Sequence, residues 1–206
     1  MRDVVAVRPG VGARRAAVLV LISSGADGPE ILFVERAATM RTHAGQIALP
    51  GGAADREDRT LVDTALREAY EEVGVEPGSV VVLGTLPAAH VAVSGFDVTA
   101  VVGWWQVPGP VTALDLAEVA QVHVVKVSDL VDPARRVTVR HPLGYTGPAF
   151  QLAGLLIWGL TAHLIDGVLE LAGWQRPWDR SRMATIPERY LMDRRASADL
   201  GGPDAH

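Results

Sequence analysis

The feature that most constrains the fold is one amphipathic helix set between strand-like runs. Thr60 is a suitable helix N-cap, with Asp63 three residues later in a box-like arrangement. Gly74 is the residue type expected just past a helix end. The apolar positions between these limits fall on a single stripe: Val62, Leu66, Ala69 and Val73. A helix over about 60–73 therefore needs a sheet to cover that stripe.

Apolar runs typical of strands precede and follow this helix. They lie at Ala16–Ile22, Ile31–Val34, Val80–Leu86, Val98–Trp104 and Val122–Val127. A second helix is predicted at about Ile157–Ala172 and a short helical turn near Ser128–Val131. Strands on both sides of a central helix predict an α/β (α+β) fold in which a mixed sheet is covered by helices on both faces.

The chain is predicted to contain one domain with two flanking segments. Its 206 residues allow one substantial core and are few for two. Residues 1–15 are an N-terminal lead-in and residues 16–175 the domain. Residues 176–206 are a polar C-terminal extension, which we expect to be partly disordered because it ends in Gly-Gly-Pro-Asp-Ala-His.

Two apolar stretches have alternative interpretations. Arg14 and Arg15 before Ala16–Ile22 resemble the front of a secretory signal, but the run is short for that role and is predicted to be a buried strand. Gln151–Leu164 is nearly all apolar, yet charged residues follow within the same helical pattern. A membrane span needs roughly 20 apolar residues, so this stretch is predicted to be a packed core helix and no membrane partner is expected.

Net charge and composition exclude some classes of binding partner and of reactive site. The formal net charge of −5 argues against a dedicated nucleic-acid binder, while a local cluster of arginines could still bind an anionic small molecule. The chain has no cysteine, which excludes disulfides, zinc–thiolate sites and thiol nucleophiles. Its absence also fits a reducing cytoplasm, the location we expect.

Three carboxylates are predicted to share one face of the first helix. Glu68, Glu71 and Glu72 stand at i, i+3 and i+4. Each close pair repels by up to several kcal/mol at an effective dielectric constant of about 20, and Arg67 alone cannot neutralise three charges. A magnesium or manganese cluster could, because hard cations favour oxygen ligands. The alternative is a solvated acidic helix face.

The surroundings of these carboxylates favour the metal. The loop Leu49-Pro50-Gly51-Gly52 precedes the helix, and the helix ends in Arg67-Glu68-x-x-Glu71-Glu72-x-Gly74. This arrangement resembles the Nudix box. The resemblance implies an α/β/α sandwich and hydrolysis of a nucleoside diphosphate linked to another group.

The same resemblance implies a role for each matching residue. Glu71 and Glu72 would be the principal ligands of Mg²⁺ or Mn²⁺, and Glu68 a further ligand or a helper of the base. Gly52 would contribute its carbonyl oxygen, and Arg67 would hold the glutamates in place. One departure concerns Asp58, because eight residues separate it from Arg67 where seven are usual. We therefore expect Asp58 to be a loop brace or helix-start residue and not a catalytic one.

A segment upstream of the helix bears on the substrate. Arg36-Ala37, three residues, Arg41, three residues and then Gly45-Gln46 through Gly51-Gly52 resemble the extra signature of the coenzyme A pyrophosphatase branch. Arginine forks suit phosphate oxygens, and glycine permits close approach of the backbone to a ligand. The predicted substrate-binding residues are Arg36, Arg41, Gly45, Gln46 and Gly51. The alternative is a loop with surface arginines.

Similarity to this branch continues downstream. It includes Ser94–Thr99, Ala117–Ala120 and Ile157–Ala162, so the resemblance covers roughly residues 16–172. Family members often place a metal-binding or water-activating glutamate where Glu118 stands. Glu118 is thus a catalytic candidate beside Arg67 and Glu68, with a solvent-facing carboxylate as the alternative.

The resemblance implies hydrolysis of coenzyme A or a derivative to 3′,5′-ADP and 4′-phosphopantetheine. Attack of water on one phosphorus would depend on Mg²⁺ or Mn²⁺. ADP-ribose, a dinucleotide or another nucleoside diphosphate derivative is the alternative substrate. A ligand-binding module of the same fold without hydrolysis is a further alternative. A homodimer is a family-based expectation.

Overall fold

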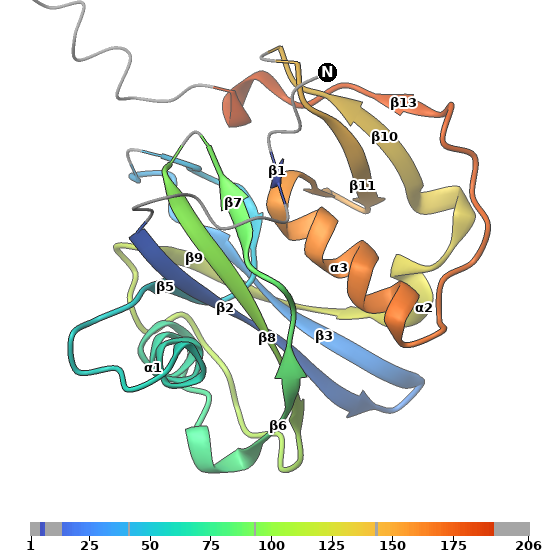
Figure 1. The fold of residues 1–206 in the computed structure, drawn as a ribbon. Coiled ribbons are helices and arrows are strands. Elements are labelled where there is room, and N and C mark those ends of the chain that lie inside the picture. The colour runs from blue at the N-terminus through green and yellow to red at the C-terminus, as the bar shows by residue number, and fades with distance from the viewer. Residues whose placement is uncertain (1–4, 7–13, 41, 93, 143, 192–206) are drawn as a thin grey trace, which may run out of the picture.

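The structure is a computed structural model that describes residues 5–6, 14–40, 42–92, 94–142 and 144–191. In this part of the chain a nine-stranded mixed sheet lies between α1 (Leu61–Val73) on one face and α3 (Gly159–Leu171) on the other (Figure 1). Its strands are β1 (Val5–Ala6), β2 (Arg14–Gly25), β3 (Gly28–Arg36), β4 (Ile47–Ala48), β5 (Gly51–Ala53), β6 (Val80–Thr85), β7 (Ala89–Val91), β8 (Phe96–Trp105) and β9 (Val119–Lys126). The predicted mixed sheet between helices is confirmed.

The strand β2 is the centre of this sheet. The order is β1-β7-β8-β2-β3-β4, with β5 also paired to β2, β6 to β8 and β9 to β3. Leu19 and Leu21 pack on the α1 side, whereas Val20 and Ile22 pack on the α3 side. A strand buried on both faces needs a continuous apolar run. The interpretation of Ala16–Ile22 as a buried strand is confirmed.

The helix α1 begins and ends where its sequence predicts. The Asp63 amide donates to the Thr60 hydroxyl oxygen at 3.2 Å, and the Thr60 amide donates to the Asp63 carboxylate at 2.9 Å. Gly74 closes the helix with a φ of 77°, a conformation that favours glycine. The residues of α1 most completely buried against the sheet include Ala65, Ala69 and Val73.

A second, four-stranded sheet lies beside α3 (Figure 1). Its order is β12 (Leu155–Ile157), β11 (Thr146–Leu152), β10 (Arg136–Arg140) and β13 (Met183–Ala184). The prediction of one core helix over Gln151–Leu164 is wrong for its first part, because residues up to 152 belong to β11 and 155–157 to β12. The turn at Gly154, with a φ of 78°, reverses the chain between them and α3 begins only at Gly159.

The C-terminal part of the described chain packs onto this second sheet. The strand β13 pairs in parallel with β10, and a 3₁₀ turn follows at Glu188–Tyr190. Ile186 and Tyr190 are 3% and 7% exposed. Residues 192–206, the end of the extension that is expected to be partly disordered, lie outside the described residues.

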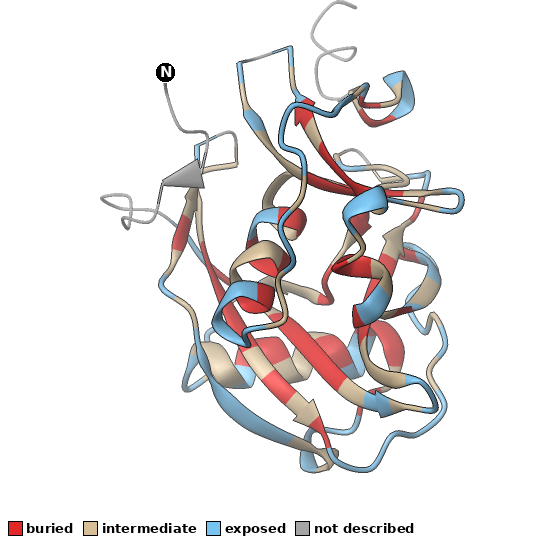
Figure 2. Cartoon of the chain, turned by 90° about the vertical axis from the view of Figure 1, so that its right-hand side faces the viewer, coloured by how far each residue is buried: buried red, intermediate tan, exposed pale blue. Residues whose placement is uncertain are grey.

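The other elements of the described residues are a short helix and two 3₁₀ turns. The helix α2 spans Val127–Leu130, and 3₁₀ turns span Pro77–Ser79 and Pro133–Arg135. Buried residues are concentrated on both sheets and on the helix sides that face them (Figure 2). None of the helices in the described ranges is long and apolar enough to cross a membrane.

Candidate active site

Glu72 is the most buried carboxylate of the predicted site, with a relative exposure of 3%. Its Oε1 accepts a hydrogen bond from Arg36 Nη1 at 3.0 Å, and its Oε2 accepts one from the Gly51 amide at 3.0 Å. Burial raises the pKa of Glu72 to about 7, against the opposing effect of Arg36 and the Gly51 amide. Glu68 and Glu118 raise this pKa further. Burial and the neighbouring glutamates therefore disfavour the charged form of Glu72.

Arg67 connects the other two helix glutamates. Its Nη1 lies 3.0 Å from Glu68 Oε1 and 2.9 Å from Glu71 Oε2. Its Nη2 also donates to the carbonyl oxygen of Ala53 at 3.2 Å. The predicted holding function of Arg67 is consistent with these contacts. Burial raises the pKa of Glu68, Arg67 opposes that change, and Glu71 and Glu118 add to it.

Asp58 holds Arg67 from the opposite side. The Asp58 Oδ1 and Oδ2 atoms accept from Arg67 Nε at 3.0 Å and from Arg67 Nη2 at 2.9 Å. This two-point contact holds the pKa of Asp58 well below its usual range, in spite of its burial. Asp58 also accepts from the Asp55 amide at 2.8 Å. The longer loop thus places Asp58 on Arg67, which agrees with a bracing function.

The two glycines before the helix let the backbone lie against its carboxylates. A Cβ added to Gly52 would be 2.5 Å from Glu68 Oε1, and one added to Gly51 would be 2.3 Å from the Ala17 carbonyl oxygen. Gly51 has a φ of 153°, in the region that favours glycine. Pairing of β5 with β2, in which Gly52 faces Ala17, fixes this loop to the central strand. A side chain at Gly52 would displace the Glu68 carboxylate, and one at Gly51 would collide with the backbone of β2.

Arg36 and Glu118 reach the cluster through an irregularity in the sheet. The register of β3 against β9 shifts between Glu35 and Arg36, so Arg36 pairs with Val119. The Ala37 amide donates to the Glu118 carbonyl oxygen at 2.8 Å, and Arg36 Nη2 lies 3.6 Å from Glu118 Oε2. The Glu118 side chain is 48% exposed. It is therefore both solvent-facing and part of the cluster, so the two alternatives for Glu118 are compatible.

The rest of the predicted substrate segment lies against the C-terminal part of the chain. Gln46 Nε2 donates to the carbonyl oxygen of Tyr190 at 3.0 Å. A Cβ added to Gly45 would be 3.7 Å from Tyr190 Cε1. Arg41, also predicted to bind substrate, lies outside the described residues. Tyr190 was absent from the sequence prediction, and no local pattern distinguishes it because its partners lie far away along the chain.

The donor set fits a divalent cation. Glu68, Glu71, Glu72 and Glu118 offer hard oxygen atoms, the ligands that Mg²⁺ and Mn²⁺ favour. The described residues contain no ready group of three His, Cys, Asp or Glu side chains for a metal. Arg67 lies between Glu68 and Glu71, and Arg36 lies between Glu72 and Glu118. A cation would therefore take over oxygen atoms that guanidinium groups now contact.

Comparison with known proteins gives a family and a fold. Residues 13–143 match the family model described as the NUDIX domain. An uncharacterized Nudix hydrolase NudL of Pectobacterium atrosepticum is 54% identical over 97 residues, which span 47% of this chain and 50% of that protein. An uncharacterized Nudix hydrolase NudL of Cronobacter sakazakii is 39% identical over 165 residues, which span 77% of this chain and 82% of that protein.

A solved structure agrees with the fold. The crystal structure of RenU, a Nudix hydrolase from M. smegmatis, superposes with a TM-score of 0.56 at 20% identity. The superposition covers 82% of this chain and 91% of that one. At this identity the likeness concerns the fold alone.

Proposed function

The chain belongs to the Nudix hydrolase family, and we propose that it hydrolyses the diphosphate of coenzyme A or a derivative to 3′,5′-ADP and 4′-phosphopantetheine. Family membership supports pyrophosphohydrolase chemistry, and Nudix hydrolases generally use divalent cations such as Mg²⁺ or Mn²⁺. The choice of coenzyme A is the finer part of the proposal. It rests on the upstream segment that contains Arg36, Arg41, Gly45, Gln46 and Gly51.

The observation that carries the proposal is the meeting of that segment with the helix glutamates. Arg36 contacts Glu72 at 3.0 Å and approaches Glu118 at 3.6 Å, and its side chain is 18% exposed. A substrate phosphate near these carboxylates would meet the Arg36 guanidinium, which suits phosphate oxygens. The 3′-phosphate distinguishes coenzyme A by extra negative charge, for which added arginine charge is favourable.

Divalent ions would be held by Glu68, Glu71, Glu72 and the carbonyl oxygen of Gly52. When bound, such a cation offsets the charge of a diphosphate and lowers the pKa of the attacking water. Arg67, braced by Asp58, keeps Glu68 and Glu71 on one side of the site. Glu118 is exposed enough to accept the proton of the water that adds across the P–O bond.

A substrate panel tests this function. We expect the highest kcat/KM for coenzyme A among coenzyme A, ADP-ribose and a dinucleotide, and no turnover after chelation of divalent metal. Arg36→Ala should lower kcat/KM for coenzyme A by about 10-fold more than for ADP-ribose, because a charge-assisted phosphate contact is lost. Arg135→Ala, whose contacts lie with Asp129 and Asp132, is the control.

Two results would contradict the proposal at different levels. Equal losses for coenzyme A and ADP-ribose in Arg36→Ala would remove the argument for coenzyme A and leave the hydrolase. No phosphoester product from any of these substrates with Mg²⁺ or Mn²⁺ would favour a binding module that does not hydrolyse.

A further inference from the structure

The segment Ile186–Leu191, here called the C-terminal strap, contacts the predicted substrate segment from outside the family match. The match ends at residue 143, and the strap follows β13. Its anchor is Tyr190, which is buried with Ile186 in a cluster of the second sheet. The other buried members of that cluster are Val137, Val139, Ala149 and Leu156. The strap is therefore held on the second sheet by its buried side chains. From there it contacts the predicted substrate segment.

Two contacts join the strap to residues 42–46, here called the loop arm. The Gln46 side-chain amide donates to the Tyr190 carbonyl oxygen at 3.0 Å, across 144 positions of sequence. The Tyr190 ring lies against Gly45, which has a φ of 68°. The Arg189 guanidinium lies 4.7 Å from the centre of the Tyr190 ring and donates to its hydroxyl at 3.2 Å. These contacts define one position of the tyrosine ring beside the loop arm.

The loop arm is in turn hydrogen-bonded to the backbone of Arg36. The Gly45 amide donates to the Arg36 carbonyl oxygen, and the Arg36 amide donates to the Gln46 carbonyl oxygen, both at 2.9 Å. The Arg36 guanidinium then contacts Glu72 at 3.0 Å. A continuous path of contacts thus runs from Tyr190 through Gln46 and Arg36 to the carboxylate cluster.

We propose that the C-terminal strap is a positioning element for substrate binding, in which Tyr190 and Gln46 fix the loop arm and thereby Arg36. The proposal rests on the proposed function for the identity of the substrate. Gln46 acts through Tyr190, because its amide nitrogen donates to the strap. The strap has no contact with Glu68, Glu71 or Glu72 among the interactions of the described residues. It therefore affects substrate binding more than the chemical step.

The kinetic test compares two buried residues of the same cluster. Tyr190→Ala should raise KM for the substrate that the wild type hydrolyses best by about 10-fold, with kcat changed by less than about threefold. Val139→Ala is the matched control, because Val139 is buried in the same cluster and belongs to β10, outside the strap. It should lower thermal stability and leave KM unchanged. Equal KM increases in both variants would overturn the proposal.

A double-variant cycle separates positioning from direct contact with substrate. Gln46→Met removes the donated hydrogen bond at similar volume, and we expect its KM to rise as in Tyr190→Ala. Tyr190→Ala keeps the main-chain carbonyl that accepts from Gln46 but removes the ring that holds this part of the strap in place. The double variant should therefore show no more than the larger single effect. Effects that multiply would mean that Gln46 acts independently of Tyr190 and would overturn the proposal. Should Tyr190→Ala not fold, Tyr190→Leu keeps much of the apolar packing, still removes the ring that lies against Gly45, and takes its place in the cycle.

Hydrogen exchange tests the anchoring without substrate. In the metal-free protein, the Gly45 and Gln46 amides should exchange about 10-fold faster in Tyr190→Ala than in Val139→Ala. Unchanged exchange would overturn the anchoring. Faster exchange together with no hydrolysis of coenzyme A would support the anchoring and contradict the proposed substrate, so the two failures are distinguishable.

Discussion

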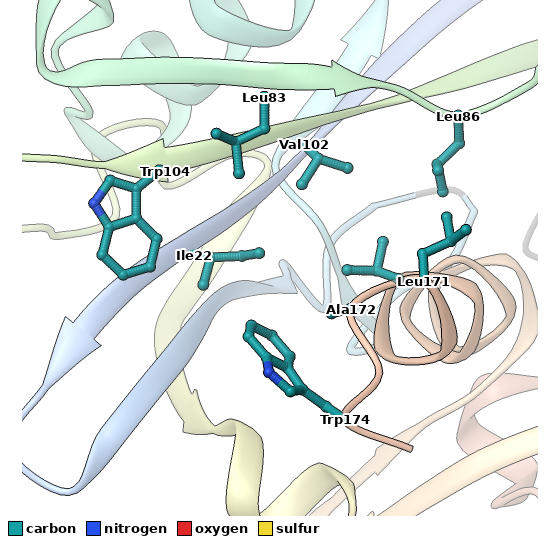
Figure 3. A pocket seen from close by; sticks show the side chains of 9 residues that line it. Ile22, Leu83, Leu86, Val102, Trp104, Leu171, Ala172 and Trp174 are labelled. Atoms are coloured by element: carbon teal, nitrogen blue, oxygen red, sulfur yellow. The ribbon is translucent and has the colours of Figure 1, made fainter.

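The two faces of the main sheet present opposite chemistry. On the α1 face, four glutamates and Asp58 surround Arg36 and Arg67. On the α3 face, a pocket of about 420 Å³ is lined by apolar side chains alone, among them Ile22, Leu83, Trp104, Leu171 and Trp174 (Figure 3). A diphosphate carries charge that the apolar pocket cannot compensate. The charged groups, and not the volume of a pocket, therefore locate a site for a diphosphate.

The largest expected difference between the two faces is in turnover. Glu72→Gln should lower kcat by on the order of 100-fold or more, because a buried carboxylate beside the reacting groups is lost. The amide oxygen of the new side chain can accept from the Gly51 amide or from Arg36, so circular dichroism of the variant is the control for its fold. Steady-state kinetics with saturating Mg²⁺ measure the effect. Turnover near that of the wild type would contradict the assignment of Glu72.

The second difference is in the pH dependence of stability. The pKa of Glu72 is raised from 4.5 to about 7 in the folded, metal-free protein. The protonated form is therefore favoured by folding, and its stabilising contribution is complete below pH 4.5 and lost as the pH rises through 7. We expect a loss on the order of 2 to 3 kcal/mol that Glu72→Gln does not show.

Denaturant unfolding with chelator at several pH values between 5 and 8 measures this difference. The comparison between wild type and Glu72→Gln cancels the contributions of titrating groups that do not interact with Glu72. Parallel stability curves for the two proteins would mean that burial does not hold Glu72 in its protonated form. Burying the charged carboxylate of Glu72 would then cost less free energy than its low exposure indicates.

A smaller effect is expected from the brace on Arg67. Asp58→Asn removes the negative charge that holds the guanidinium through two hydrogen bonds. Because Arg67 then fixes Glu68 and Glu71 less well, kcat should fall by about 10-fold, as for partners that orient metal ligands. The apparent affinity for Mn²⁺, from activity against metal concentration, should fall with it. Unchanged kinetics would limit Asp58 to a structural function in the loop.

The smallest effect is expected in the apolar pocket. Leu171 is 74% exposed at its rim, and Leu171→Ser should change the free energy of unfolding by only about 0.5 kcal/mol. Both kcat and KM should stay at their wild-type values, because the pocket lies on the sheet face opposite α1. A raised KM would mean that the apolar face is part of the substrate site and would contradict the division between the two faces.

The charged face was largely predictable from sequence, because its determinants are local. The Thr60 cap, the Gly74 stop and the spacing of Glu68, Glu71 and Glu72 all belong to one helix. The assignment of Arg36 to the substrate site came only from the resemblance, and its contact with Glu72, 36 positions away, has no local signal. Arg36 and Glu118 lie side by side because the strand register shifts, and no sequence pattern predicts that shift.

The second sheet was missed for a different reason. Arg136-Val137-Thr138-Val139-Arg140 alternates as a half-buried strand does, so β10 carried a usable signal. The apolar residues before α3 instead resembled the start of that helix, because a short apolar run does not distinguish a strand from a buried helix. The contact of Tyr190 with Gln46 joins positions 144 apart and has no local signal.

The most direct test of the account is a crystal structure of the protein with Mn²⁺, with the ions located by anomalous scattering. We expect manganese at the oxygen atoms of Glu68, Glu71 and Glu72, with Arg36 or Arg67 displaced from at least one of its present contacts. Manganese bound elsewhere, with these glutamates still paired to the arginines at saturating metal, would contradict this expectation.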